Sequence, residues 1–332
     1  MDQSDYRPEL SVVIPLYNEQ DNLEELHRRL TESLGRLNIA YELIFVNDDS
    51  RDETPRLLDA IHRDDSSVGV IHLSRNFGHQ AAVSAGIDLS QGRAVVVMDG
   101  DLQDPPEVIP DFVRLWRAGY DVVYAIRQNR KENFLKRHGY RVFYRLLNAI
   151  SDIDIPLDSG DFGLMDRRVV DALKGLPEHK RFVRGLRTFV GFRQIGFAYE
   201  RAARGAGQPK YTFRSLVGLA VDGLVSFSSY PLRLVTYLGV AVASFAFLLL
   251  LWVIADAFSQ HSAPRGWAST IVVVLFMGSV QLICLGIIGE YIRLVFLESK
   301  GRPTYIVREY RPANILGRHT AERSTRYGRS GR

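Results

Sequence analysis

Cysteine is nearly absent from this 332-residue chain, which contains Cys284 alone. An internal disulfide framework is therefore excluded, and a reducing compartment is expected. A large excess of charge is lacking too, because the formal net charge is only +4. So mild a charge does not indicate nucleic-acid binding, and no nucleic-acid partner is expected. The first ten residues, MDQSDYRPEL, are polar and lack the apolar core of a signal peptide, so none is expected.

The first part of the chain alternates two kinds of short segment. β-Branched runs occur at residues 10–16, 41–46, 68–73, 94–98 and 121–126. Helix-like stretches separate them, at Asp21–Leu34, Thr54–Arg63, Gln80–Ser90 and Pro106–Ala118. Apolar runs of this kind are typical of strands buried on both faces. The alternation therefore predicts an α/β fold with a doubly wound, mostly parallel sheet.

Glycine-rich phosphate loops are missing from the ends of these strands. Neither G-x-G-x-x-G nor G-x-x-x-x-G-K-[ST] occurs there, which argues against nicotinamide chemistry and against a P-loop. The strands end instead in the polar stretches PLYNE, VNDDS, SRNFGH and DGDLQD. Ligands of such sheets bind at the carboxyl ends of the strands. An acid-rich site is therefore expected along one edge of the sheet.

Two carboxylates follow the fourth strand, at Asp99 and Asp101. An extended backbone would turn both to the same side, where they repel each other unless a cation lies between them. A divalent ion held by one or two carboxylates and diphosphate oxygens meets this need, and hard oxygen ligands favour Mg²⁺ or Mn²⁺. A solvated acidic turn is the alternative for D-x-D alone, but the acid-rich neighbouring strand ends favour the metal.

Charged residues are absent from two long runs, Leu234–Ala255 and Trp267–Gly289. Each exceeds the ~20 residues that a membrane-spanning helix needs, whereas buried helices of soluble proteins seldom stay uncharged this long. The link DAFSQHSAPRG carries one Arg, and basic residues flank the outer ends: Arg233, Arg293, Lys300, Arg302, Arg308 and Arg311. The positive-inside rule then predicts a multi-pass protein of the inner or plasma membrane, with both termini and the first domain cytoplasmic.

The segment KENFLKRHGYRVFYRLLNAI, residues 131–150, predicts an amphipathic helix. Arg137, Arg141 and Arg145 are spaced four apart on one stripe, and an apolar stripe lies beside it. A basic, aromatic helix of this kind is typical of a membrane interface. The alternative is a helix packed on the domain with its charged face in solvent. Residues 216–232 are expected to form a second interfacial segment.

Six motifs, VVIPLYNE, VNDDS, LSRNFGH, DGDLQDPP, SGDFGLMDR and GQPKY, are followed by a paired hairpin. In this order, from Leu10 to about Tyr305, they resemble family-2 glycosyltransferases of the GT-A fold. Within that family they resemble the polyprenyl-phosphate group of dolichol-phosphate mannose synthases and bactoprenol glucosyltransferases. The resemblance implies inverting sugar transfer from a nucleotide-sugar to a polyprenyl phosphate, with UDP-glucose as the expected donor. It also implies a homo-oligomer and a GT-A-type sheet followed by interfacial helices and a two-helix hairpin.

The resemblance also implies roles for individual residues. Pro15, Tyr17, Asn18 and Glu19 match a nucleotide-binding segment, and Asp48 matches an acid that contacts the base. Asp99, Asp101 and Gln103 match the metal and diphosphate site, Asp161 the proposed catalytic base, and Lys210 the lysine of a mobile loop. Arg127 matches an arginine near the phosphates, and Arg137 and Arg141 are expected to bind the acceptor phosphate. Two positions depart from the pattern: Asp49 replaces a glycine, which would alter its turn, and Pro209 replaces a serine, which would stiffen the loop.

Each of these roles has a structural alternative. Tyr17 would pack, Asn18 would cap the next helix, Asp48 and Asp161 would stabilise bends, and Lys210 would be an ordinary surface residue. The predicted division of the chain is a cytoplasmic catalytic domain at 1–210, a juxtamembrane segment at 211–233, a transmembrane hairpin at 234–297 and a cytoplasmic basic tail at 298–332.

Other functions stay open on the sequence. One is a catalytically inactive, membrane-anchored scaffold that binds lipid or a partner protein. Another is a glycosyltransferase with a different donor, such as UDP-N-acetylglucosamine or GDP-mannose. A processive polysaccharide synthase is disfavoured because the chain lacks Q-x-x-R-W, and a nucleotidyltransferase is the weakest choice.

Overall fold

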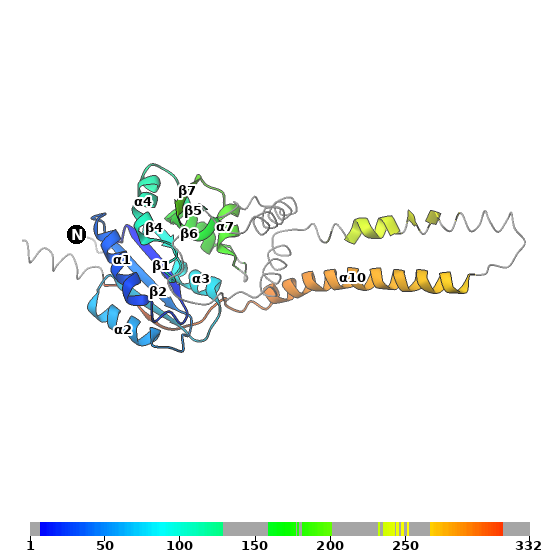
Figure 1. Ribbon diagram of the computed structural model, residues 1–332, viewed down its shortest axis with the longest axis horizontal. Helices are drawn as coiled ribbons and strands as arrows, with labels where there is room; N and C mark the ends of the chain where they lie inside the picture. Colours follow the sequence, from blue (N-terminus) through cyan, green and yellow to red (C-terminus); the bar gives the residue numbers. More distant parts are fainter. Residues whose placement is uncertain are drawn as a thin grey trace, which may run out of the picture. The chain divides into compact units, whose positions relative to one another are not determined.

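The computed structural model describes residues 7–128, 159–176, 178, 181–200 and 266–314, and most of 235–251 together with residue 232. The chain divides into two units. The first, called here the sheet unit, comprises Met1–Arg137, Ile155–Pro209 and Arg302–Arg332. The second, called the hairpin unit, comprises His138–Asp154 and Lys210–Gly301. Each is described by itself (Figure 1).

The five β-branched runs form the strands that the sequence predicts. They are β1 (Leu10–Leu16), β2 (Tyr41–Asn47), β3 (Val68–Leu73), β4 (Ala94–Val97) and β5 (Val122–Gln128). β1 lies between β2 and β4 and is parallel to both, and β2 is parallel to β3. Every side chain of β1 to β4 is buried, which explains their apolar runs.

Three further strands, which the sequence analysis did not predict, complete an eight-stranded sheet of order β7-β5-β6-β4-β1-β2-β3-β8. β6 (Ser159–Asp166) is antiparallel to both β4 and β5. β7 (Gln194–Glu200) is parallel to β5, and β8 (Val307–Arg311) is antiparallel to β3. The predicted α/β fold with a mostly parallel sheet is therefore confirmed, with antiparallel strands added to it.

Helices cover both faces of the sheet, as a doubly wound fold requires. α1 (Leu23–Gly35), α2 (Thr54–Asp64), the 3₁₀ turn η2 (Pro106–Val108) and α4 (Ile109–Arg117) share one apolar core with the sheet. α3 (His79–Leu89), α6 (Arg167–Lys174) and α7 (Val183–Phe189) pack together on the other face. α3 approaches β1 closely, because a Cβ added at Gly86 would lie 2.2 Å from Val13 Cγ1.

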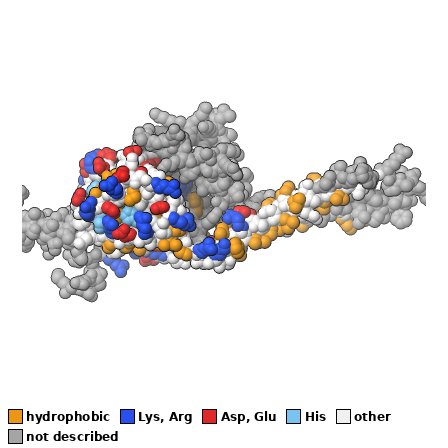
Figure 2. Space-filling view, turned by 90° about the horizontal axis from the view of Figure 1, so that it is seen from below, with side chains coloured by type: hydrophobic (Ala, Val, Ile, Leu, Met, Phe, Trp, Pro, Cys, Tyr) orange, Lys and Arg blue, Asp and Glu red, His pale blue; other side chains and the backbone are white. Residues whose placement is uncertain are grey.

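The hairpin unit contains α10 (Trp267–Ser299), a 33-residue helix. Within it Phe276–Ser299 has a mean hydropathy of 1.8 and is the one span, among the described residues, that is long and apolar enough to cross a membrane. Apolar side chains are exposed along α10 (Figure 2). The described residues between 232 and 251 are all helical, as expected for the first arm of the hairpin. The predicted interfacial segment at 131–150 lies outside the described residues, and so does the segment at 216–232 apart from residue 232.

After α10 the chain returns to the sheet unit. The Ser74 N–H donates to the Ile306 carbonyl at 2.9 Å, and the Asn314 N–H donates to the Ser66 carbonyl at 2.7 Å. Between these two bonds β8 pairs along β3. Part of the segment expected to be a basic tail is therefore an edge strand of the sheet.

Candidate active site

Strands β1 to β4 run parallel, so the loops that follow them lie along one edge of the sheet, called here the carboxyl edge. β6 is antiparallel to β4 and pairs Gly163 with Val97, so β6 begins at this same edge. Asp161, in the first residues of β6, therefore lies beside the residues that follow β4. The topology brings together the acidic motifs that the sequence places more than fifty residues apart.

The loops after β1 and β2 are joined by hydrogen bonds. The Asn18 N–H donates to Ser50 Oγ at 3.0 Å, and Asn18 Oδ1 accepts from the Arg51 N–H at 2.8 Å. Asn18 has a left-handed backbone, with φ of 54°. It does not cap α1, whose N-cap is Asn22. Of its neighbours, Pro15 is buried in β1 and Tyr17 is 37% exposed.

Asp48 ties the end of β2 to the loop before α3. Its Oδ1 accepts from the Phe77 N–H at 2.7 Å and its Oδ2 from the Gly78 N–H at 2.9 Å. Burial raises the pKa of this carboxyl, although the two amides oppose the shift. Both oxygens therefore hold the loop, and contact with a base remains a prediction. Asp49 adopts φ of 57°, the left-handed conformation of a glycine, which Asp tolerates better than most residues.

The D-x-D stretch is a turn, so the extended geometry expected for Asp99 and Asp101 is wrong. β4 ends at Val97, and Gly100 and Asp101 lie in a turn. A Cβ at Gly100 would lie 2.3 Å from Leu16 Cδ2, so a larger residue here would require the Leu16 side chain to move. Asp101 Oδ1 accepts the Gln103 N–H at 3.2 Å, and Gln103 is 8% exposed.

His79, the first residue of α3, lies between the two acidic motifs. Its Nε2 is 3.5 Å from Asp99 Oδ1 and 3.5 Å from Asp161 Oδ2. Burial works against its charged form, but the carboxylates of Asp161 and Asp99 raise the pKa of His79 above its ordinary value. The ring therefore lies between the residue predicted to bind metal and the residue predicted to be the base, and both carboxylates favour its protonated form.

Three more side chains surround Asp161. Gln80 Nε2 donates to Asp161 Oδ2 at 2.9 Å, and Arg184 Nε on α7 lies 3.5 Å from Asp161 Oδ1. Arg187, which is 2% exposed, adds a buried positive charge nearby. Burial would favour the neutral acid, but His79, Arg184 and Arg187 outweigh it and hold the pKa of Asp161 well below its usual range. Asp161 is therefore a carboxylate at neutral pH.

The carboxylates near Asp99 fit a divalent cation that is shared with a phosphate ligand. Asp99 Oδ1 is buried and accepts no hydrogen bond within the described part of the chain. Burial, together with repulsion from Asp161, Asp104 and Asp101, raises the pKa of Asp99 to about 6, against the effect of His79. No group of three or more His, Cys, Asp or Glu among the described residues could hold a metal unaided. A Mg²⁺-type ion bound by one or two carboxylates needs no such group, because substrate oxygens and water complete its shell.

The structure thus brings eight of the predicted residues to the carboxyl edge. They are Pro15, Tyr17, Asn18, Glu19, Asp48, Asp99, Asp101 and Asp161, and Gln103 lies beside Asp101. The backbone of Arg127 is part of β5, but its side chain is outside the description. Arg137, Arg141 and Lys210 lie outside the described residues, so their roles stay predictions.

Sequence reasoning missed four residues of this edge: His79, Gln80, Arg184 and Arg187. His79 and Gln80 directly follow the SRNFG stretch at the end of the third predicted strand, so their position was a usable signal. Arg181, Arg184 and Arg187 recur every three residues, which on a helix places them on one face. That spacing was the only local sign of α7.

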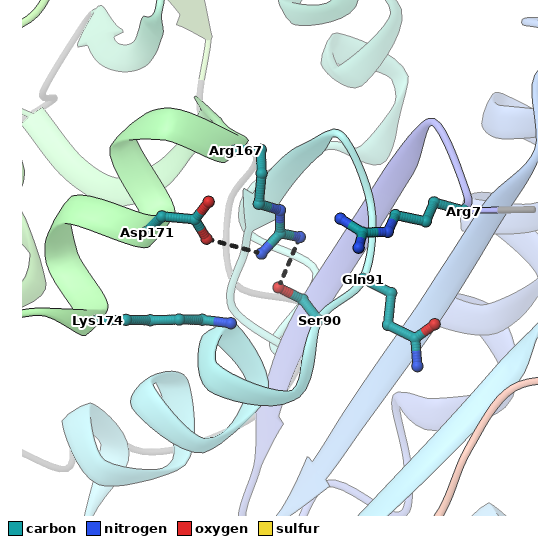
Figure 3. Close-up of a pocket in the computed structure, with 6 residues that line it drawn as sticks. All are labelled: Arg7, Ser90, Gln91, Arg167, Asp171 and Lys174. Carbon is teal, nitrogen blue, oxygen red and sulfur yellow. Dashed lines mark hydrogen bonds and ion pairs between the residues drawn. The ribbon is translucent and has the colours of Figure 1, made fainter. Parts of the chain in front are cut away.

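The opposite edge of the sheet, called here the amino edge, has a pocket of about 330 Å³ (Figure 3). Its lining residues are Arg7, Ser90, Gln91, Arg167, Asp171 and Lys174. Arg167 Nε donates to the Gly92 carbonyl at 2.8 Å, and Lys174 Nζ donates to the Asp88 carbonyl at 2.8 Å. These two side chains therefore donate to backbone carbonyls, and the pocket lies at the edge of the sheet opposite the acidic site.

Comparison with known proteins gives matches over most of the chain. Residues 11–174 match Glycosyl transferase family 2, and residues 230–293 match the GtrB C-terminal hairpin. An uncharacterized glycosyltransferase of Synechocystis sp. is 46% identical over 90% of this chain and 94% of its own length. The bactoprenol glucosyl transferase of Shigella phage SfV is 41% identical over 90% of this chain and 98% of its own length.

Among solved structures, a mannosyltransferase from Pyrobaculum calidifontis in complex with GDP-Man and Mn²⁺ matches with a TM-score of 0.47. It is 17% identical to this chain, and the match covers 88% of this chain and 86% of that one.

Proposed function

The chain belongs to glycosyl transferase family 2 and to the branch with bactoprenol glucosyl transferases, and on this premise we propose that it glycosylates a polyprenyl phosphate. The donor in this proposal is UDP-glucose, and transfer inverts the anomeric carbon at the cytoplasmic face of the membrane. The apolar helix α10 and the match to the GtrB hairpin support association with the membrane. The remaining features proposed are a multi-pass anchor in the inner or plasma membrane, cytoplasmic termini and a homo-oligomer.

One observation carries the proposal: two carboxylates, Asp99 and Asp161, lie on either side of His79 at the carboxyl edge, each 3.5 Å from its Nε2. In transfer, an oxygen of the lipid phosphate attacks the anomeric carbon of the sugar. The bond from that carbon to the diphosphate breaks, and the departing nucleoside diphosphate takes the electron pair. The site must therefore hold two groups of phosphate oxygens on either side of one sugar.

The donor side of the site is the pair of joined loops after β1 and β2, with the turn after β4. Pro15, Tyr17, Asn18, Glu19 and Asp48 would position the nucleoside. Asp99, Asp101 and Gln103 would hold Mg²⁺ or Mn²⁺, and the ion would neutralise charge that develops on the leaving diphosphate. On the acceptor side, Lys210, Arg127, Arg137 and Arg141 would supply cations for the lipid phosphate.

The chemistry of the acceptor limits what Asp161 has to do. A phosphate monoester has its second pKa near about 6, so most acceptor molecules are dianions at neutral pH. A general base has no proton to remove from them. Asp161 is also surrounded by cations that keep it ionised, and it accepts a hydrogen bond from Gln80. We therefore propose that Asp161 orients the sugar or acceptor and accepts a hydrogen bond from a sugar hydroxyl.

Two substitutions at Asp161 test this role. Asp161→Asn keeps the shape and one acceptor oxygen, so it should retain more turnover than Asp161→Ala. Raising the pH from about 6 to about 8 should recover part of the loss in Asp161→Asn, because the acceptor becomes fully ionised. Sugar transfer is measured in membranes supplied with polyprenyl phosphate and a panel of nucleotide-sugars, which also identifies the donor. Equal and pH-independent inactivity of both variants would mean that the carboxylate charge itself is required.

Product analysis in the same assay separates the alternatives. Release of a nucleoside diphosphate with a glycosylated lipid supports the transferase. No turnover with any donor would favour an inactive scaffold, and release of pyrophosphate would favour a nucleotidyltransferase.

A further inference from the structure

Asp88, in the last turn of α3, joins two segments that lie far apart in the sequence. Its Oδ2 accepts a hydrogen bond from the Tyr305 hydroxyl at 2.8 Å. Both its oxygens accept from Arg181 Nη1 at 3.2 Å. The side chains of Asp88 and Arg181 are largely buried, at 23% and 17% exposed. Burial and the neighbouring Asp88 raise the pKa of Tyr305, so its hydroxyl stays protonated and donates at any working pH.

Arg181 stands just before α7, the helix that carries the guanidinium groups around Asp161. α7 has seven residues, and no side-chain hydrogen bond caps its N-terminus at Phe182. A helix this short has little stability of its own, so its position depends on contacts with neighbours. Two of these contacts are on α3: Arg181 with Asp88, and the Val183 N–H with Gln80 Oε1 at 3.0 Å.

The same α3 residue that holds α7 also holds Asp161, because Gln80 Nε2 donates to Asp161 Oδ2. The Arg184 Nε to Asp161 Oδ1 distance is 3.5 Å, beyond good hydrogen-bond length. The positive electrostatic potential from Arg184 and Arg187 at Asp161 therefore depends on the position of α7, since Arg184 makes no short hydrogen bond that would fix it to Asp161. A small shift of α7 would move Arg184 and Arg187 together.

Tyr305 belongs to the segment that returns from the hairpin unit to the sheet. α10 ends at Ser299, and Tyr305 directly precedes Ile306, whose carbonyl accepts the Ser74 N–H. β8 then fixes the following residues against β3. Tyr305 is therefore held by the sheet and points its hydroxyl at Asp88.

We propose that Tyr305, Asp88 and Arg181 form a positioning relay through which the segment after the membrane hairpin holds α7 against Asp161. All three are positioning residues, and none of them is required to touch substrate. The inference rests on the role proposed above for Asp161. It predicts that loss of the Tyr305 hydroxyl lowers turnover although the donor-binding loops are intact.

The test compares Tyr305→Phe, Asp88→Asn and the double variant in the full chain, purified with its membrane segments. Tyr305→Phe should lower kcat about fivefold and Asp88→Asn about tenfold. Each decrease corresponds to a rise in the activation barrier similar in size to the net contribution of one hydrogen bond. The donor KM should stay within about twofold, because the loops after β1 and β2 are not involved. The double variant should resemble Asp88→Asn alone, since both substitutions break the same relay.

Tyr310→Phe is the matched control. Tyr310 lies in β8 of the same returning segment, and its hydroxyl makes no hydrogen bond within the described residues. This variant should keep wild-type kcat. Thermal unfolding of each variant is recorded alongside.

Three results would overturn the relay. They are wild-type kcat in Tyr305→Phe and Asp88→Asn, losses that multiply in the double variant, or lower thermal stability with unchanged turnover of the folded protein. Asp161→Ala in the same assay separates this inference from the proposed function. If Asp161→Ala is inactive and Tyr305→Phe is fully active, only the relay fails. If Asp161→Ala is fully active, the role of Asp161 fails and the relay fails with it.

Discussion

Charged side chains cluster at both edges of the sheet, but their hydrogen-bond partners differ. At the carboxyl edge, Asp99 Oδ1 is buried without a hydrogen bond in the described part of the chain, and the Asp161 carboxylate lies 3.5 Å from both His79 Nε2 and Arg184 Nε. At the amino edge, Arg167 and Lys174 each donate to a backbone carbonyl at 2.8 Å. Charged side chains whose hydrogen bonds are satisfied by the backbone stabilise the fold. A charged side chain with an unsatisfied buried atom is a candidate for binding a ligand.

The direction of the helices explains why the edges differ in sign. In a β-α unit the helix returns to the start of the next parallel strand, so α3 begins at the carboxyl edge and ends at the amino edge. The N–H groups at its start favour anions such as phosphate, and the carbonyls at its end favour cations. Lys174 meets such a carbonyl at Asp88. At the other edge Asp48 has such N–H partners, but the buried Asp99 Oδ1 accepts no hydrogen bond from the described residues, which supports a bound cation beside Asp99.

The largest effect is expected from Asp101→Asn at the carboxyl edge. The variant should fold and lose activity about 100-fold, a barrier increase of about 2.7 kcal/mol, because it removes a charged ligand from the proposed metal site. Activity is measured as sugar transfer with and without added Mg²⁺ or Mn²⁺. Asp111→Asn, at an exposed position of α4, is the control and should stay active. Full activity of Asp101→Asn, or of the wild type in excess chelator, would contradict the metal assignment.

A smaller effect is expected from Arg184→Gln, which weakens the field around Asp161. His79 on α3, Arg187 on α7 and Asp99 after β4 are the other charged groups that face this carboxylate. Because the folded-state pKa of Asp161 is depressed, its ion pairs stabilise the fold above its unfolded pKa of about 3.9 and lose this effect as pH falls through the folded value.

Arg184→Gln should therefore cost about 2 kcal/mol of unfolding free energy at pH 7, and the difference from the wild type should narrow below about pH 4. Thermal unfolding at both pH values measures it, and Arg184→Lys should restore part of the loss. A difference that does not change with pH would show that Arg184 acts through packing and not through charge.

The sequence predicts the parts of the fold that local patterns encode. All five β-branched runs became strands, and the four helix-like stretches became α1, α2, α3 and η2 with α4. β6 escaped prediction because its sequence, SGDFGLMD, mixes Gly and Asp with apolar residues. Its Gly163 is required by packing, since a Cβ there would lie 2.7 Å from the Val123 carbonyl oxygen. That contact depends on the neighbouring strand and has no local signature.

The residues of the site also fall into those that local motifs predict and those that only tertiary contacts reveal. Asp99, Asp101 and Asp161 stand in motifs that a reader of the sequence can recognise. The positions of His79 and Gln80 after SRNFG were a usable signal, but their contacts with Asp161 became visible only in the fold, because Gln80 meets Asp161 across 81 residues of sequence. β8 is similar: its VREYR contains three charged residues and no regular alternation, and its partner β3 lies before the membrane hairpin. Long-range pairing of this kind is set by tertiary packing, which no local pattern reports.

At the amino edge, Arg167→Met should affect stability and not turnover. Arg167 donates Nε to the Gly92 carbonyl and also reaches Ser90 Oγ at 3.3 Å. Leaving these acceptors without their donor should cost about 1–2 kcal/mol of unfolding free energy. The kcat of the folded protein should stay at the wild-type value. Thermal unfolding and sugar transfer on the same preparation measure both, and loss of kcat without loss of stability would refute the distinction between the edges.

Lys174→Met should have the smallest effect. The substitution removes a hydrogen bond to the last turn of α3, worth about 0.5–1 kcal/mol at a helix C-terminus. It also removes a cost, because burial and the nearby Arg167 lower the pKa of Lys174, which means that the fold disfavours its charge. A lysine with a depressed folded-state pKa destabilises the fold most at pH below that pKa, and the penalty fades as pH rises toward the unfolded value of about 10.4.

The two terms oppose each other, so the net change should be below about 1 kcal/mol at pH 7. Methionine keeps most of the length of the side chain, so packing should change little, and thermal unfolding in parallel with sugar transfer gives the measurement. A loss of more than about 2 kcal/mol, or any fall in kcat, would mean that the cations of the amino edge do more than complete backbone carbonyls. The pocket of Figure 3 would then have to be treated as a second functional site.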